Sequence, residues 1–165
     1  LHGSSAASDV YKRQEFELSS GWQLSNALIG IGRGDLFGIG LGNSIQKNLY
    51  LPEPHTDFIF AIILEETGII GGFLLMLLFI LLITSIVQIS FDALRQNRLF
   101  QGYVCFGIGS LLSIQSIFNI GVNIGLLPTK GLTLPFISYG GASLIIFMLM
   151  MGIVFRVDFE NRNLD

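Results

Sequence analysis

The residues best placed for chemistry are an aspartate and a histidine at the end of the segment 51–57 (LPEPHTD). A long apolar run begins directly after Asp57, so the Asp57 carboxylate and the His55 imidazole are expected at the mouth of a membrane helix. Ionisable residues at the membrane edge are costly and are functional-site hypotheses by default. A carboxylate where water meets hydrocarbon is suited to chemistry on a lipid-linked substrate.

The residues alone leave two interpretations of Asp57 open. Aspartate favours the first turn of a helix, and Pro52 and Pro54 hold the preceding chain extended, so Asp57 fits a structural helix start. The same position favours the ionised carboxylate. An ionised, positioned carboxylate can act as a general base toward an attacking sugar hydroxyl, with a rate effect of roughly 10²–10⁴.

Glu65 and Glu66 lie farther along the same predicted helix. Glu65 stands about 12 Å beyond Asp57 along the axis, more than the roughly 5–9.5 Å that separates paired carboxylates in glycosidases. This spacing disfavours a hydrolase that uses two acids on one helix. The position of Glu65 and Glu66, about two turns inside the helix start, predicts instead a polar cavity or a basic partner. Lys130, in a short turn on the same side, is the candidate partner, and a lysine that snorkels to the interface is the alternative.

The elements that position these residues are predicted to be membrane helices. Only 13% of the residues are charged, against about a quarter in globular proteins. No charge occurs in 67–91, 99–129 or 131–155, and each stretch exceeds the roughly 20 residues that cross about 30 Å of hydrocarbon. A chain of this size has no soluble shell to cover three such helices. We therefore expect an all-α polytopic membrane protein.

Transmembrane helices are predicted over 58–90, 99–127 and 136–156, joined by turns over 91–98 and 128–135. With three spans, the turn 91–98 and the tail 157–165 share one side. Basic residues gather there and favour the cytoplasm for that side: Arg95, Arg98, Arg156 and Arg162. The segment 15–57 and the turn 128–135 then lie outside, in the periplasm of a Gram-negative cell.

The outer loop 15–57 is predicted to contain a short amphipathic or re-entrant helix around Trp22–Ile31. Its glycines lack the Gly-Lys-Ser/Thr and strand context of a phosphate loop, so we expect them to allow tight bends and close helix contacts. Arg33 and Lys47 flank these glycines. Solvation at the surface is the commoner role of such residues, and binding of a diphosphate is the functional alternative.

Residues 1–14 (LHGSSAASDVYKRQ) are polar and unpatterned and resemble translated adapter sequence. They are expected to be a non-native or disordered leader, with an ordinary exposed loop as the alternative. Cys105 is isolated in an apolar run, and His55 lacks partners at metal-ligand spacing. These residues predict neither a disulfide nor a metal site.

Three long motifs resemble one known family. The segments are LPEPHTDFIFAIILEETGIIGG, NIGVNIGLLPTKGLTLPFISYGGASL and VFRVDFENR. They are similar to the SEDS family (shape, elongation, division and sporulation), and PTKGLTLP and RVDFE look closest to its cell-division branch. The resemblance runs from Gly21 to about Arg162 and departs mildly where EETG replaces the usual EELG. It implies the last three transmembrane helices of a roughly ten-helix SEDS fold, preceded by a large periplasmic loop.

The resemblance implies a peptidoglycan glycosyltransferase that polymerises lipid II and inverts the anomeric centre. The family's catalytic aspartate falls on Asp57, and its functional lysine falls on Lys130, where a cation can steady a diphosphate or order the aspartate loop. His55, Thr56 and Ser138 lie within matching motifs and are expected at the substrate, as are Arg33, Lys47 and Glu65.

The expected partners are lipid II, the undecaprenyl diphosphate product, a class B penicillin-binding protein transpeptidase and other divisome membrane proteins, with no nucleic acid. The expected location is the inner membrane at the division septum, with the catalytic face periplasmic. No cofactor is certain, and a divalent cation, Mg²⁺ or Mn²⁺, is left open. A lipid II flippase and a non-catalytic scaffold that recruits a transpeptidase remain as alternatives. The clustering of charges at one face favours surface chemistry over transport.

Overall fold

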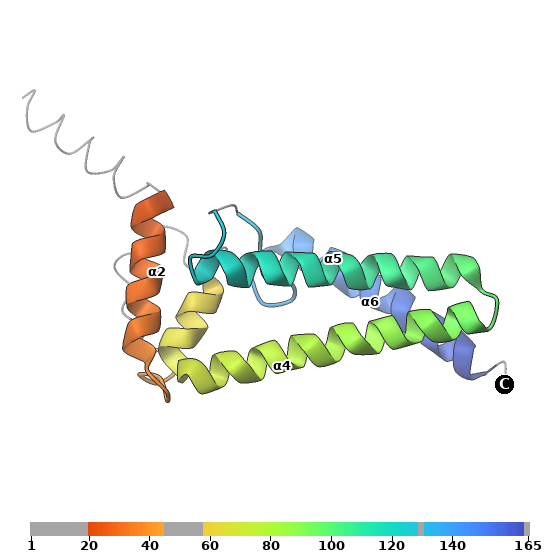
Figure 1. The fold of residues 1–165 in the computed structure, drawn as a ribbon, viewed down its shortest axis with the longest axis horizontal. Coiled ribbons are helices and arrows are strands. Elements are labelled where there is room, and N and C mark those ends of the chain that lie inside the picture. The colour runs from red at the N-terminus through yellow and green to blue at the C-terminus, as the bar shows by residue number, and fades with distance from the viewer. Residues whose placement is uncertain (1–19, 45–57, 129–130, 164–165) are drawn as a thin grey trace, which may run out of the picture.

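The computed structural model describes residues 20–44, 58–128 and 131–163, and these residues form four helices. Helix α2 spans Ser20–Gly34 and precedes the three long helices: α4 (Ile59–Arg95), α5 (Leu99–Asn123) and α6 (Gly141–Arg162). The long helices run alongside one another, while α2 lies across their direction at one end (Figure 1). That end also contains the first turns of α4.

Two apolar clusters hold the helices together. The larger cluster lies among α4, α5 and α6 and contains Ile86, Ala93, Cys105, Ile108, Leu112, Phe147, Val154 and Val157. The smaller cluster joins α2 and the start of α4 to the end of α5 and contains Ala27, Phe58, Ala61 and Val122. The second cluster therefore fixes the chain directly after Asp57 against two other helices.

Within the described residues, α4, α5 and α6 are each long and apolar enough to cross a membrane. Many of their large apolar side chains point outward, and Phe73, Phe100 and Leu149 are each about two-thirds exposed or more. Such faces suit lipid or further helices rather than water. The prediction of an all-α polytopic membrane fold is confirmed.

The last membrane helix is displaced from its predicted range of 136–156. It begins at Gly141 because the preceding residues form a turn, in which the Ser138 hydroxyl accepts from Leu134 N (2.7 Å) and Phe136 takes a positive φ of 66°. The same helix continues to Arg162 rather than ending at 156. Its added turns contain ion pairs between side chains four residues apart, a spacing that stabilises a helix. The non-helical tail predicted for 157–165 would not bring these side chains together.

The predicted ends of the other two membrane helices also differ from the structure. Helix α5 ends at Asn123 rather than at 127, because Gly125 adopts a φ of 77° and Leu126 N turns back to Gly121 O (2.8 Å). Helix α4 continues past 90 to Arg95. The turn that joins α4 to α5 is correspondingly shorter than the predicted range 91–98.

Helix α4 is not the continuous helix that its composition predicts. It breaks at Gly68, where φ is 73° and ψ is −175°. The first segment, Ile59–Thr67, packs beside α2 and runs across the direction of the remaining length of α4 (Figure 1). Only glycine adopts this combination of φ and ψ readily.

The loop after α2 supplies the hydrogen bonds that the break removes. In a continuous helix the amides of Ile69 and Ile70 would donate four residues back, to Glu65 and Glu66. All four of these backbone groups bond to the loop instead. The bonds are Ile69 N to Asp35 O (3.0 Å), Ile70 N to Leu36 O (3.4 Å), Ile39 N to Glu65 O (3.0 Å) and Gly40 N to Glu66 O (3.1 Å).

This exchange requires glycine on both sides of the contact. A Cβ at Gly34 would collide with the carbonyl of Leu64, and one at Gly38 would collide with the carbonyl of Glu66. A Cβ at Gly68 would meet the carbonyl of Leu36. The prediction that glycines of the outer loop serve tight bends and close contacts is confirmed at Gly34 and Gly38.

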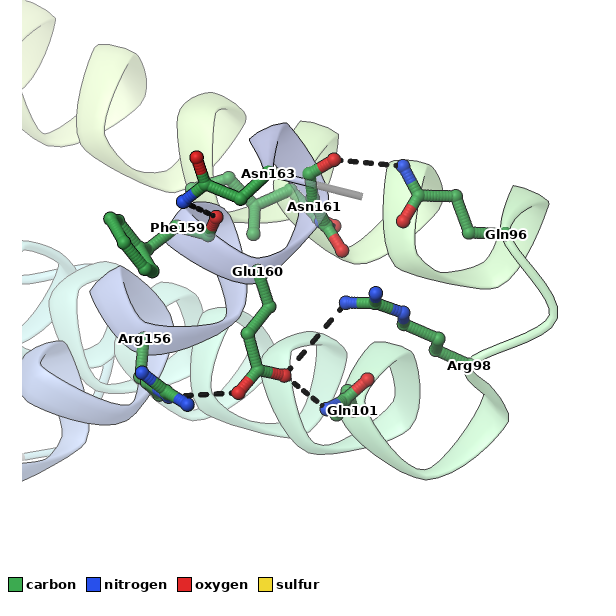
Figure 2. A network of polar contacts seen from close by, with 9 residues as sticks. Gln96, Arg98, Gln101, Arg156, Phe159, Glu160, Asn161 and Asn163 are labelled. Atoms are coloured by element: carbon green, nitrogen blue, oxygen red, sulfur yellow. Dashed lines mark hydrogen bonds and ion pairs between the residues drawn. The ribbon is translucent and has the colours of Figure 1, made fainter. Parts of the chain in front are cut away.

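The opposite end of the bundle is joined by a charged network around Glu160 of α6 (Figure 2). Its carboxylate pairs with Arg156 (2.8 Å) and Arg98 (3.8 Å) and accepts from Gln101 Nε2 (2.7 Å). The Arg98 and Glu160 side chains are only 19% and 25% exposed, so this pair is partly desolvated. The network ties the end of α6 to the start of α5.

We expect Gly38→Ala to lower the free energy of unfolding by more than about 2 kcal/mol, because the new methyl group adds backbone strain and collides with a carbonyl. Denaturant or thermal unfolding of the protein in detergent measures this. Gly107→Ala is the matched control, since a Cβ there meets nothing, and it should be neutral or stabilising by up to about 1 kcal/mol. Equal effects of the two changes would contradict the proposed packing.

We expect Glu160→Ala to cost about 1–2 kcal/mol, because it leaves the partly buried guanidinium of Arg98 without its anion. Asp158→Ala removes a similar pair whose partner, Arg162, is 77% exposed, and should cost less than about 0.5 kcal/mol. The same unfolding measurement in detergent compares both changes. A loss for Asp158→Ala as large as that for Glu160→Ala would argue against a special role for Glu160.

Candidate functional site

Five predicted site residues lie outside the described residues: Lys47, His55, Thr56, Asp57 and Lys130. The structure describes the chain on either side of them. Phe58 follows Asp57 directly, and Pro128 and Gly131 flank the short gap that contains Lys130. The candidate site is therefore described through the residues that hold the segments next to Asp57 and Lys130.

The start of α4 is held by a side chain from another helix. Phe58 is the N-cap residue and makes no side-chain cap hydrogen bond. Instead, Ala61 N donates to Asn123 Oδ1, at the end of α5 (3.1 Å). Phe58 and Ala61 are both buried. The helix start that follows Asp57 is thus fixed to the C-terminal end of α5.

The segment after Lys130 is held by the same helix. Asn119 Nδ2 donates to Leu132 O (2.6 Å), and Gln115 Nε2 donates to Thr133 O (3.0 Å). Gln115, Asn119 and Asn123 are spaced by four residues, so they share one face of α5. That face therefore contacts both the segment that follows Asp57 and the segment that follows Lys130.

Sequence reasoning missed these three amides. Their signal was present as a polar residue at every fourth position within the uncharged stretch 99–129. In a membrane helix such a stripe marks a face that bonds to protein rather than to lipid.

Glu65 is fully buried in the first segment of α4. Ser44 donates its hydroxyl to Glu65 Oε2 (2.5 Å), while Oε1 has no hydrogen-bond partner among the described residues. The described partner of Glu65 is thus a hydroxyl rather than a cation. Pairing of Glu65 with Lys130 stays a prediction.

Two further predicted site residues are described. Arg33 is exposed in the last turn of α2, where a cation suits the negative end of the helix dipole. Ser138 is buried in the turn before α6, where its hydroxyl accepts from Leu134 N. Their predicted contacts with substrate stay predictions.

A divalent cation was left open as a cofactor. Across 20–44, 58–128 and 131–163, no group of three or more His, Cys, Asp or Glu side chains could hold a metal ion. The described residues therefore do not provide a donor set by themselves, and the involvement of a cation stays open.

Several curated proteins similar to this chain are described as "Probable peptidoglycan glycosyltransferase FtsW". The protein of Coxiella burnetii is 54% identical over 147 residues, which cover 89% of this chain and 40% of that protein. The protein of Marinomonas mediterranea is 56% identical over 144 residues, covering 87% of this chain and 36% of that protein. This chain thus spans about two-fifths of the length of these relatives.

A solved structure shares the arrangement of the helices. It is described as "Structural coordination of polymerization and crosslinking by a peptidoglycan synthase complex", and it superposes with a TM-score of 0.63 at 29% identity. The match covers 83% of this chain and 37% of the solved chain.

The pattern of the FtsW/RodA/SpoVE family, described as cell cycle proteins, matches residues 8–163, and this range includes part of the leader expected over 1–14. The match extends over nearly the whole chain. It agrees with the two relatives above, which are 54% and 56% identical to this chain. The chain belongs to the FtsW/RodA/SpoVE (SEDS) family.

Proposed function

We propose that this chain is the part of a cell-division peptidoglycan glycosyltransferase that carries the catalytic base, Asp57. Relatives that are about half identical bear that activity in their descriptions, which supports the assignment. The structural observation that carries it is the shared end of α5. Asn123 and Asn119 on that helix hold the helix start after Asp57 and the segment after Lys130.

In the proposed reaction, Asp57 removes the proton from the 4-hydroxyl of one lipid II disaccharide. The hydroxyl oxygen forms a bond to the anomeric carbon of a second molecule, while the bond from that carbon to the diphosphate breaks. Undecaprenyl diphosphate leaves with both electrons of that bond, and the anomeric centre inverts. General base catalysis needs a positioned base, and the helix start directly after Asp57 is held in place by Asn123.

Lys130 is proposed to stabilise the negative charge that develops on the leaving diphosphate. Arg33 and Lys47 are proposed as further diphosphate contacts, and His55, Thr56 and Ser138 as contacts with the sugar or its carrier. Arg33 is exposed in the last turn of α2, which leaves its side chain accessible to a ligand.

Glu65 is proposed to organise the site rather than to exchange protons. Its bond to Ser44 and the backbone bond from Ile39 to its carbonyl tie the loop after α2 to the first segment of α4. In this proposal the loop after α2 holds the first segment of α4 in place while the substrate binds.

The family and the apolar helices place the chain in a membrane as a multi-pass protein. We propose the inner membrane at the septum, with the site on the periplasmic face. The similar solved structure is described as a peptidoglycan synthase complex that coordinates polymerisation with crosslinking, which supports a class B penicillin-binding protein as the partner. Other divisome membrane proteins are proposed as further partners.

Asp57→Asn in the full-length protein, purified with its transpeptidase partner, is expected to abolish lipid II polymerisation, with a loss of roughly 10²-fold or more. The change keeps the size of the side chain and removes the ionisable carboxylate. Gel analysis of glycan chains measures the product, while detergent solubility and partner co-purification report folding.

Near-normal polymerisation by Asp57→Asn would refute the general-base role and reopen transport or scaffolding. A scaffold would tolerate the change in cell-division complementation, whereas an enzyme would not. If the protein is a flippase, Asp57→Asn should lower lipid II transport in vesicles, and any loss of glycan should follow the loss of transport.

Lys130→Gln is expected to lower polymerisation by about 10-fold or more, because the diphosphate loses a charge-assisted contact. Lys130→Arg keeps the charge and should retain more activity than Lys130→Gln. The kcat for lipid II in the same gel assay measures both. Wild-type activity of Lys130→Gln would show that the charge at this position is not required.

A further inference from the structure

Helix α4 begins without a cap of its own. The first four amides of a helix have no intrahelical acceptor, and a side chain at the N-cap normally accepts from the amide of the second or third helical residue. Phe58 occupies the N-cap of α4 and cannot do this. The amide of Ala61, the third helical residue, is instead satisfied by Asn123, which lies 62 residues away in the sequence. Asn123 is therefore a helix cap supplied by another helix.

The side-chain amide of Asn123 also takes part in a chain of hydrogen bonds. Asn123 Nδ2 donates to Asn119 O (2.8 Å) and lies 3.3 Å from Asn119 Oδ1. Asn119 Nδ2 donates in turn to Leu132 O (2.6 Å). An unbroken path of polar contacts thus runs from the helix start after Asp57 to the segment after Lys130.

Both asparagines are almost completely buried, at 1% exposure for Asn119 and 0% for Asn123. Buried amides are costly unless they are satisfied, so the geometry of satisfied networks is strongly specified. The orientation of Asn123 is also determined, because its oxygen must face Ala61 N and its nitrogen must face Asn119 O. Neither segment can then shift on α5 without breaking a buried bond.

We infer that Asn119 and Asn123 are positioning residues that set the placement of the start of α4, which follows Asp57, relative to the segment that follows Lys130. The inference rests on the proposed function for its catalytic meaning, since the base and the cation must act on the same pair of substrates. Misplacement of reacting groups by about 1 Å can cost roughly 10²-fold in rate. Neither asparagine needs to touch the substrate.

The test uses Asn119→Leu and Asn123→Leu in the full-length protein purified with its transpeptidase partner. Each change keeps a similar volume and removes the amide. We expect kcat for lipid II polymerisation to fall about 10- to 100-fold with little change in KM. Asn123→Asp keeps an acceptor for Ala61 N but loses the donor to Asn119, so its kcat should lie between those of the wild type and Asn123→Leu.

Asn161→Leu is the matched control for simple loss of stability. Asn161 is also a buried asparagine, but it donates to Ile89 O near the opposite end of the bundle (Figure 2 shows its surroundings). Its removal should lower the melting temperature without the loss of kcat, when activity is measured well below the transition. A kcat loss for Asn161→Leu equal to that for Asn123→Leu would overturn the inference.

A second readout does not depend on activity. Spin labels at Ile59→Cys and Gly131→Cys report the distance between the two segments. We expect the distance distribution to broaden or shift in Asn119→Leu and Asn123→Leu and to stay unchanged in Asn161→Leu. An unchanged distribution in the first two variants would overturn the inference. If the wild type fails to polymerise lipid II, the proposed function fails, while this measurement still decides whether the asparagines position the segments.

Discussion

Backbone polar groups that are removed from water must find partners inside the protein, and the break in α4 depends on this constraint. A helix that bends sharply loses hydrogen bonds, and in apolar surroundings each unpaired group is costly. Here the loop after α2 donates to two freed carbonyls and accepts from two freed amides. Because Gly34, Gly38 and Gly68 carry no Cβ, the two backbones can approach closely enough for this exchange. The break in α4 therefore depends on contacts with α2 and with the loop that follows it.

The break determines where the candidate site can lie. It directs the first segment of α4 across the bundle, so that the helix start reaches the C-terminal end of α5 (Figure 1). A continuous α4 would carry its own start away from the C-terminal end of α5, so the bond from Ala61 N to Asn123 Oδ1 would be lost. The buried Glu65 and its partner Ser44 hold the inner side of the bent segment. Backbone, carboxylate and amide bonds therefore support the same short stretch of helix.

The two ends of the bundle are joined by different chemistry. The end where α4 begins uses buried amides, backbone groups and the Ser44–Glu65 bond, whereas the opposite end uses arginines and carboxylates around the partly buried Glu160. Ion pairs with an exposed partner, such as Arg162 with Asp158, contribute little to stability. Buried amides demand a particular orientation and allow little. This difference agrees with a site that needs fixed geometry at the end where α4 begins.

The sequence by itself determined the three membrane helices and the family, because length, hydropathy and contiguous motifs are local properties. It also indicated that the glycines of residues 30–42 serve close contacts. Only the tertiary structure decided that α4 breaks at Gly68, since an interior glycine in an apolar run equally suits helix packing. It also decided that Ser44 pairs with Glu65, and that Asn123 caps the helix after Asp57. These bonds join residues 21 and 62 positions apart, and the partners of a buried polar group depend on which distant segments the fold brings beside it.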